Sequence, residues 1–411
     1  MTHDPSEYIK GLQQLLVSDK KNIAFLFGAG TSLSKKNKNS IIIPAMEEMT
    51  ENIEKKLSEN EPFKKALEEI KKEIGDGYNI ESLLSNIELK IQVMGDSGSL
   101  NGLCKEDFKK LIKQLKQEIK KIVSVHDKIL DNDNLSNLIH VDFAEWIGRA
   151  NRKHSIEIFT TNYDYLFELG LEEKKIPFYD GFTGSYNPFF NAESIEDMGF
   201  IPKQTKLWKI HGSLGWHYDS KAKKICRKES EEEDILIYPS TLKYSESNKQ
   251  PYTALMDRLT NFLKQPDTIL ITCGYSFSDE HINERILTAL HSNDSGHVVA
   301  LFYGSLDEDS NLKKLAESNK KLSAYGAKNA IIGGQFGDWQ LKREPDKDDT
   351  INVNIYFDED AGFDLGIEKN TDAKGNEEWT GKGKLILPDF SKFVAFLQSM
   401  ILKDNYLDDV E

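Results

Sequence analysis

Three short segments carry the residues of this chain whose types are best suited to chemistry. Residues 28–30 read Gly-Ala-Gly and follow the apolar run 23–27, which predicts a buried strand, so the backbone there can turn sharply and approach a pyrophosphate. Asn162 follows a second strand-like run, residues 155–159, and His211 comes directly after a third. An imidazole can take and return a proton near neutral pH, as acid–base catalysis requires. Because the carboxyl ends of parallel strands share one edge of a sheet, a phosphate-binding loop and a proton-transferring side chain are predicted to meet there.

Each of these residues also has a purely structural interpretation. Asn162 or Asp164 can cap the helix that is expected to begin at residue 165, and His211 can be a core histidine satisfied by the backbone. The loop at 28–30 lacks the third glycine of the dinucleotide fingerprint, because Leu33 stands in its place, and no clear acidic residue closes a second strand downstream. From the residues alone, these alternatives stay open.

Two segments resemble the catalytic segments of the sirtuins: residues 159–164, Phe-Thr-Thr-Asn-Tyr-Asp, and residues 209–213, Lys-Ile-His-Gly-Ser. The loop at residues 28–32 and a later Ile-Pro pair also repeat the order of the sirtuin NAD loop. The resemblance implies chemistry at the glycosidic carbon that joins nicotinamide to ribose, with Asn162 and His211 as catalytic residues that lie at the ligand edge rather than in the core. It also implies that NAD is bound by the following residues: Gly28, Ala29, Gly30, Thr31, Ser32, Pro44, Thr161, Asp164, Gly274 and Ser276.

The chain departs from the protein-deacetylating sirtuins at several positions. Thr161 stands where they have Gln, and Tyr163 where they have Ile. They carry two Cys-x-x-Cys pairs around a structural zinc, whereas the 3 cysteines of this chain are far apart, so no zinc is expected. Residues 273–283 resemble the prokaryotic branch of sirtuin-like proteins that acts in phage defence. Within that branch, a domain of this length without a fused nucleotide sensor or C-terminal effector resembles the subunit that works with a HerA-type ATPase.

That branch implies an NAD+ hydrolase (NADase) that releases nicotinamide and ADP-ribose and depletes NAD+ in antiphage defence by abortive infection. Asn162 would place the attacking water, and His211 would serve as the base. An NAD-dependent protein deacylase uses the same residues, and the missing zinc cysteines count against it. A non-catalytic subunit that binds NAD or ADP-ribose within an ATPase complex is a further alternative. A nuclease is disfavoured because no paired Asp and Glu with metal-ligand spacing stands out.

Composition narrows the function classes. A formal net charge of -15 argues against broad binding to nucleic acid or to an anionic membrane, because phosphate contacts need clustered Lys and Arg. No stretch approaches the roughly 18 apolar residues of a membrane span, and the N-terminus lacks a basic region followed by an apolar core. A cytoplasmic protein without a membrane partner is therefore expected, and its sparse cysteines agree with a reducing compartment.

The order of strand and helix signals predicts an α/β fold, a Rossmann-like, doubly wound parallel sheet of the sirtuin type. The expected catalytic domain comprises residues 1–44 and 146–340, with a large helical insertion at 45–145 and a small α+β appendage at 341–411. The appendage has no recognisable catalytic motif and is interpreted as peripheral or as an oligomer contact. The segments expected to be strands are 23–27, 155–159, 206–210, 234–238, 268–272, 297–303 and 330–332, and those expected to be helices are 5–20, 389–402 and the segment with Leu312, Leu315 and Leu322.

The insertion and the segment 177–228 carry predictions about what surrounds the site. A thin layer over one sheet cannot bury the apolar stripe of the insertion's long helix, so we expect a homo-oligomer larger than a dimer and a ring-forming HerA-type ATPase partner. The alternative is that the insertion folds on itself and only shields the active-site edge. Residues 177–228 are expected to cover the nicotinamide pocket, with 179–186 as a loop over it. The stripe consists of Phe108, Leu111, Ile112, Leu115, Ile119, Ile122 and Val123.

Overall fold

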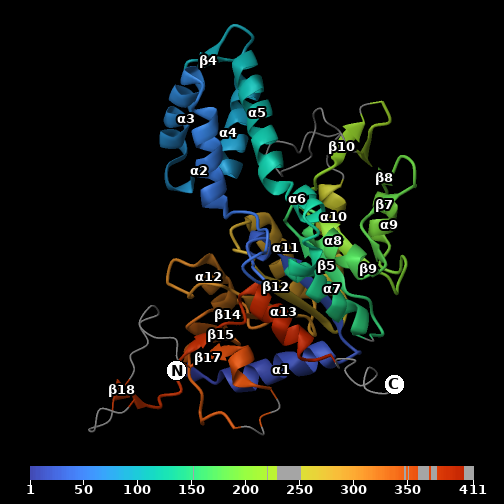
Figure 1. Ribbon diagram of the computed structural model, residues 1–411, viewed down its shortest axis with the longest axis vertical. Helices are drawn as coiled ribbons and strands as arrows, with labels where there is room; N and C mark the ends of the chain where they lie inside the picture. Colours follow the sequence, from blue (N-terminus) through green and yellow to red (C-terminus); the bar gives the residue numbers. More distant parts are fainter. Residues whose placement is uncertain are drawn as a thin grey trace.

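The computed structural model of the chain describes residues 1–150, 152–219, 221–228, 251–346, 349, 351–359, 370–371 and 377–401. The strand expected at 234–238 lies outside these residues. Within them, the chain forms one large mixed sheet with helices on both faces and a helical insertion that stands away from the sheet along the long axis of the molecule (Figure 1). None of the described helices is both long enough and apolar enough to cross a membrane.

The large sheet has 10 strands in the order β1-β16-β15-β14-β13-β12-β2-β5-β9-β6. The strands from β14 to β6 run parallel, and β15 is antiparallel to both of its neighbours. The chain winds from β2 through β5 to β9 on one side and then returns to β12, β13 and β14 on the other, so the winding reverses beside β2 and the predicted doubly wound α/β sheet is confirmed. The strand bounds are β1 Thr2–His3, β2 Asn22–Phe27, β5 Glu157–Thr160, β6 Phe178–Tyr179, β9 Thr205–Lys209, β12 Thr268–Cys273, β13 His297–Leu301, β14 Leu322–Tyr325, β15 Asn329–Ile332 and β16 Gln335–Trp339.

Both faces of the sheet are buried, as an unbroken apolar run such as 23–27 requires. Side chains alternate along β2, so Phe25 and Phe27 contribute to one apolar cluster, and Ala24 and Leu26 to a second cluster on the opposite face. The first cluster includes residues of α1 (Pro5–Val17), α7 (Ile139–Arg149), α8 (Leu166–Glu173) and α13 (Phe390–Gln398), and the second includes residues of α9 (Ala192–Glu196), α10 (Tyr252–Lys264), α11 (Glu280–Ser292) and α12 (Asn311–Ser318).

The insertion contains its own helical bundle, which corrects the expectation of an exposed apolar stripe. The stripe on α5 (Lys105–Val123) packs against α2 (Met46–Leu57) and α4 (Ile80–Val93), with α3 (Glu61–Ile74) in the same cluster. Leu111, Leu115 and Ile119 are each 0% exposed, so they cannot form a contact with another chain without unfolding the bundle. A short hairpin, β3 (Ser99–Leu100) and β4 (Leu103–Cys104), lies at its tip, and α6 (His126–Asp131) follows it (Figure 1).

The C-terminal helix is part of the main core rather than a peripheral feature. Phe390 and Phe393 of α13 are 2% and 0% exposed, and their rings contact Phe27 and Phe25 of β2 at centroid distances of 5.2 and 6.0 Å. The described part of the appendage also contributes β17 (Phe357–Asp358) paired with β20 (Lys384–Leu385), and the short pair β18 (Asn370–Thr371) with β19 (Glu377–Glu378). One further expectation is wrong: Leu322 begins strand β14, and α12 ends at Ser318.

A buried ion pair supports the sheet behind the candidate site. Glu157 of β5 accepts hydrogen bonds from Arg258 Nε (2.9 Å) and Nη2 (2.6 Å) and from Trp208 Nε1 (2.7 Å). The Arg258 Nη1 also donates to the carbonyl oxygens of Ile195 and Asp197. The pair therefore fastens α9 and α10 to strands β5 and β9. The segment 177–228 contributes β6 and β9 to the large sheet and also forms a small separate sheet of β7 (Phe182–Thr183), β8 (Phe189–Phe190), β11 (Lys224–Arg227) and β10 (Trp216–Asp219).

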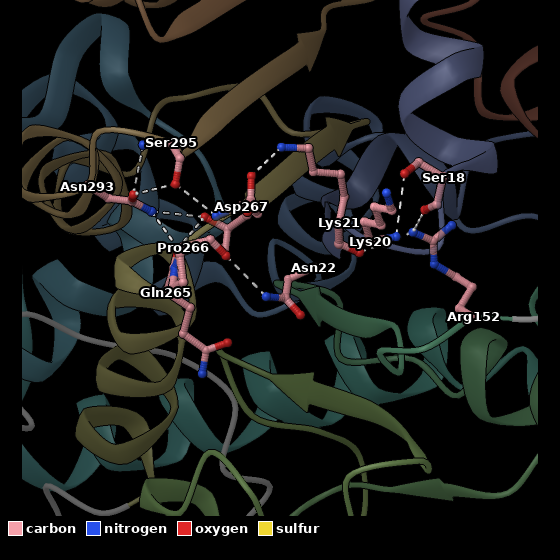
Figure 2. Close-up of polar contacts among 11 residues, drawn as sticks. Ser18, Lys20, Lys21, Asn22, Arg152, Gln265, Pro266, Asp267, Asn293 and Ser295 are labelled. Carbon is pink, nitrogen blue, oxygen red and sulfur yellow. Dashed lines mark hydrogen bonds and ion pairs between the residues drawn. The ribbon is translucent and has the colours of Figure 1, made fainter.

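Polar contacts close the amino ends of β2 and β12, at the edge opposite the candidate site (Figure 2). Asn22 Nδ2 donates to the Pro266 carbonyl oxygen (3.2 Å), and Arg152 Nη2 donates to the carbonyl oxygens of Ser18 (2.6 Å) and Lys21 (3.1 Å). These bonds satisfy backbone groups that the ends of the strands and of α1 leave unpaired.

Candidate active site

A cavity of about 680 Å³ lies at the carboxyl edge of the sheet, where the winding reverses. It collects the predicted residues from four strand ends. Thr31 is the one predicted residue that does not line it, because Thr31 is fully buried within the loop. The predicted residues that line the cavity are Gly28, Ala29, Gly30, Ser32, Pro44, Thr161, Asn162, Asp164, His211, Gly274 and Ser276.

Hydrogen bonds fix the orientation of the Asn162 amide. Its Nδ2 donates to Thr31 Oγ1 (3.0 Å) and to Ser32 Oγ (2.8 Å), two hydroxyls that themselves donate to the Gly28 carbonyl and to Asp164 Oδ2. Because each hydroxyl has a single proton, both must accept from Asn162, so the NH₂ group faces them. The amide oxygen Oδ1 has no hydrogen bond to any described residue and is the acceptor that Asn162 offers to the cavity.

The helix-capping alternative applies to Asp164 and not to Asn162. Asp164 Oδ1 accepts from the Leu166 backbone N–H (3.0 Å) near the start of α8, while its Oδ2 accepts from Ser32. Asp164 therefore serves both the local fold and the link to the phosphate loop. Asn162 is 6% exposed and Asp164 3%, so both residues belong to a buried hydrogen-bond network that lines the cavity.

A buried lysine holds the backbone of the same loop from behind. The Lys209 Nζ donates to the Asp164 carbonyl oxygen and pairs with Glu168 Oε1 at 3.0 Å, and the lysine side chain is 2% exposed. Burial raises the pKa of Glu168 above its usual value, although the charge of Lys209 opposes this. Lys209 is the last residue of β9, two positions before His211, so a single strand end fixes both segments.

His211 is oriented by the carboxylate of Asp279. Its Nε2 lies 3.1 Å from Asp279 Oδ2, while Asp279 Oδ1 accepts from the Ile282 N–H and caps α11. Burial raises the pKa of Asp279, but the hydrogen bond and charge of His211 outweigh it and hold that pKa below its usual value. An ionised carboxylate can only accept, so Nε2 carries the proton and Nδ1 is the basic nitrogen.

Gly28, Gly30 and Gly274 allow two loops to pack closely together, and their role in NAD binding stays a prediction. A Cβ on Gly28 would lie 2.5 Å from the Gly274 carbonyl oxygen, and a Cβ on Gly30 would lie 2.6 Å from the Gly274 Cα. Gly274 itself has a φ of 65°, and its oxygen accepts from the Gly30 N–H at 3.0 Å. The β12 loop occupies the direction that a side chain at Gly30 would take, while Gly30 itself lines the cavity. The segment after β2 is a 3-10 turn, Ala29–Thr31, and not the start of an α-helix.

Residues of the helical insertion cover the cavity, and the sequence analysis did not identify the ones that line it. Asn79, Glu81, Ser82 and Ser85 come from the first turns of α4, and the Tyr163 hydroxyl reaches Glu81 Oε1 at 3.2 Å. Their polar spacing on a helix is indistinguishable from a solvated face, so the sequence carries no signal for them. The expectation that residues 179–186 lie over the site is not met, since no residue of that segment lines the cavity.

The described residues hold no group of three or more His, Cys, Asp or Glu side chains placed to bind a metal ion, and the cysteines are free thiols. Comparison with known protein families matches residues 156–325 to the model of the SIR2-like domain. This range contains Asn162, His211 and Gly274, whereas the loop at 28–32 precedes it. A comparison with curated proteins gives no match. The chain therefore contains a SIR2-like domain, which spans residues 156–325 and implies a function that involves NAD.

Proposed function

We propose that the protein is an NAD+ hydrolase that cleaves the bond between nicotinamide and ribose to give nicotinamide and ADP-ribose. The observation that carries the proposal is the arrangement around the cavity of about 680 Å³. The amide oxygen of Asn162, which has no hydrogen bond to a described residue, and His211, which is oriented by a carboxylate, both belong to its lining beside the β2 loop. A volume of this size suits one half of a dinucleotide.

The reaction balances with water alone. The bond between ribose C1′ and the nicotinamide nitrogen breaks, and its electron pair stays with nicotinamide, which leaves as a neutral base. The water oxygen bonds to C1′, and one proton is released. The site must therefore hold the ribose while positive charge develops on C1′, direct water to the vacated face and accept a proton.

Asn162 supplies the acceptor for the attacking water. Its NH₂ group is committed to Thr31 and Ser32, so its oxygen is held in one direction and can accept a hydrogen bond from water in the cavity. Since Ser32 also donates to Asp164, the position of that oxygen depends on both loops. This is positioning through binding geometry rather than through acid–base chemistry.

His211 supplies the base. With Nε2 donating to Asp279, Nδ1 is available to accept a proton from a ribose hydroxyl or from the incoming water. The carboxylate stabilises the imidazolium that results and returns the ring to the same tautomer afterwards. A positioned base of this kind contributes typically about 10² to 10⁴ in rate.

The wider role is proposed from the resemblance to the phage-defence branch: depletion of NAD+ in abortive infection against phage, with a HerA-type ATPase partner. The homo-oligomer larger than a dimer was expected from the apolar stripe of the insertion and stays a proposal. An unregulated NADase would deplete its host, so we expect low activity from the isolated chain and higher activity with the partner. Burial of the α5 stripe removes one reason to expect the oligomer. Light scattering of the full chain tests it, and a monodisperse monomer at micromolar concentration would rule it out.

The test of the reaction is chromatography of the products after NAD+ is incubated with the full chain, with and without an acetylated peptide. Nicotinamide and ADP-ribose formed without peptide support hydrolysis, whereas products that need the peptide identify a deacylase. Asn162→Ala and His211→Ala should each abolish the activity. Because Asn162 donates two buried hydrogen bonds, its variant should also lose about 1–2 kcal/mol of stability, so thermal unfolding is measured alongside.

A matched control exists at the opposite edge of the sheet. Asn293 is also 6% exposed, and its Nδ2 donates to the carbonyl oxygens of Leu263 and Gln265 (both 2.6 Å), as Figure 2 shows in part. Asn293→Ala should lower stability by a similar amount and leave NAD+ hydrolysis unchanged. Wild-type hydrolysis by Asn162→Ala would refute the assignment.

A further inference from the structure

A second cavity, of about 420 Å³, adjoins the first and extends it toward the C-terminal helix. Both cavities are lined by Gly30 and by residues 274–276, so these two loops lie between them. The second cavity ends at Pro388, Asp389 and Phe390, which lie outside the SIR2-like match. We propose that Asp389 binds the adenosine ribose of NAD+ and excludes the 2′-phosphate of NADP+, an inference that rests on the proposed function.

The pair of cavities matches the chemistry of a dinucleotide. NAD+ consists of two nucleosides joined by a pyrophosphate, and the proposed reaction places the nicotinamide half in the cavity with Asn162 and His211. The adenosine half then falls in the second cavity, on the far side of Gly30 and Gly274. Apolar and aromatic side chains suited to the faces of a purine line this cavity, namely Leu33, Leu301, Phe302, Tyr303 and Phe390.

Asp389 has one carboxylate oxygen committed to the fold and one available. Its Oδ1 accepts from the Ser391 N–H (2.8 Å), the Ser391 hydroxyl (2.7 Å) and the Ser34 hydroxyl (3.3 Å). Its Oδ2 has no hydrogen bond to a described residue. A carboxylate oxygen accepts readily from a ribose hydroxyl, and the negative charge repels a phosphate at the same position.

Other dinucleotide-binding folds place an acidic residue for this purpose about 20 residues after the glycine loop. Here the next strand of the large sheet along the chain is β5, which ends at Thr160 rather than at an acidic residue. The residues that line the second cavity include no carboxylate besides Asp389 and no lysine or arginine. Lys384 lies outside the lining, with its Nζ 5.8 Å from the centre of the Tyr303 ring. The recognition group missing from the fingerprint is thus supplied from the far end of the chain.

The position of Asp389 is fixed by packing on both sides. After it, Phe390 and Phe393 anchor α13 on β2; before it, the Pro388 carbonyl oxygen accepts from the Cys273 thiol at the end of β12 (3.5 Å). A carboxylate held this firmly can discriminate between ligands that differ by a single substituent, because it cannot move away from the added group.

The experiment measures kcat/KM and equilibrium binding for NAD+ and NADP+ with the full chain and its variants. The wild type should prefer NAD+ by about 100-fold or more, since a like charge at the ribose is costly. Asp389→Asn keeps a good helix cap and an acceptor oxygen but removes the charge, and Asp389→Ser keeps the cap and also makes room. We expect each variant to raise the NADP+ to NAD+ ratio by about tenfold or more, with the KM for NAD+ within a few-fold of wild type for Asp389→Asn.

The control is Asp4→Asn, because Asp4 caps α1 through the same contacts, to the Ser6 N–H (2.9 Å) and hydroxyl (2.7 Å), and lines neither cavity. The NADP+ to NAD+ ratio of kcat/KM in Asp4→Asn should equal that of the wild type. An unchanged ratio in both Asp389 variants, with NAD+ hydrolysis intact, would overturn the inference and leave the proposed function standing. A wild type that neither hydrolyses nor binds either dinucleotide, alone or with its partner, would overturn both.

Discussion

His140 offers a test of the packing beneath the candidate site. It is 1% exposed in α7, and neither ring nitrogen has a hydrogen-bond partner among the described residues. Its ring lies edge-on to Phe167 (centroids 4.6 Å apart) and tilted to Phe390 (5.1 Å). Burial lowers the pKa of His140 from 6.5 to about 4, although the nearby charge of Asp164 opposes the shift.

Proton linkage gives the direction and size of the pH dependence that His140 adds to the free energy of unfolding. Between pH 6.5 and about 4 the unfolded chain binds a proton at His140 and the folded chain does not, so stability is fully present above pH 6.5 and falls as the pH falls toward 4. At 1.36 kcal/mol per pH unit, the full interval corresponds to about 3 kcal/mol, of which about 2 kcal/mol is lost by about pH 5.

The assay is urea unfolding of the wild type and His140→Phe near pH 7.5 and near pH 5. Phenylalanine retains the ring packing and removes two nitrogens that have no partner among the described residues, so the variant should be at least as stable as the wild type at the higher pH. The variant's advantage should then grow by about 2 kcal/mol at the lower pH. His297, whose pKa is also lowered by burial, is present in both proteins and cancels in the comparison. Parallel losses of stability in the two proteins would refute the reasoning.

Three further predictions concern the loops and the insertion. Asp279→Asn keeps the cap on α11 but frees the His211 ring, so kcat for NAD+ should fall by about 10-fold or more. Because the pKa of Asp279 is lowered, the stability difference from wild type should be constant near neutral pH and shrink only as the pH falls below 3.8, as pH-dependent unfolding can show. Gly30→Val should lower the melting temperature as well as NAD+ affinity in calorimetry, because the new side chain meets the Gly274 backbone; an unchanged melting temperature would argue against the loop contact. Leu115→Ala should destabilise the insertion by about 2–5 kcal/mol, seen as loss of amide-exchange protection there, and should not change the molecular mass in light scattering.

The sheet could be predicted from sequence because its strands are buried on both faces. The apolar runs within β2 and β12 leave no choice of solvent-facing side, so each had to lie inside a parallel sheet with its loop at the same edge. The shorter strands β5 and β9 are also fully buried, although they contain Glu157, Lys206 and Lys209. That reasoning is sufficient to bring Asn162 and His211 to one cavity. The prediction that Leu322 belongs to a helix was wrong because β14 has four residues and begins soon after α12 ends at Ser318. So short a strand gives an apolar pattern that cannot be told from helical spacing.

Contacts between distant segments could not be predicted in the same way. An apolar helix stripe shows that a face is buried but not against what, so the same pattern fits an oligomer contact and the bundle that α5 forms with α2 and α4. The amphipathic C-terminal helix gave no sign that its partner was the central strand β2. The contact between His211 and Asp279 joins positions 68 residues apart, and no local spacing reports it.

The site depends on residues on both sides of the SIR2-like match. The orientation of Asn162 requires the hydroxyls of Thr31 and Ser32, which precede residue 156, and the second cavity is closed by Pro388 and Asp389, which follow residue 325. Strand β2 lies between β12 and β5, so the matched segment alone would lack the strand that joins its two halves. The loop after β2, the Asn162 loop and the C-terminal helix therefore form one cooperative unit. The roles proposed for Asn162 and Asp389 would therefore both depend on the packing of α13 against Phe25 and Phe27.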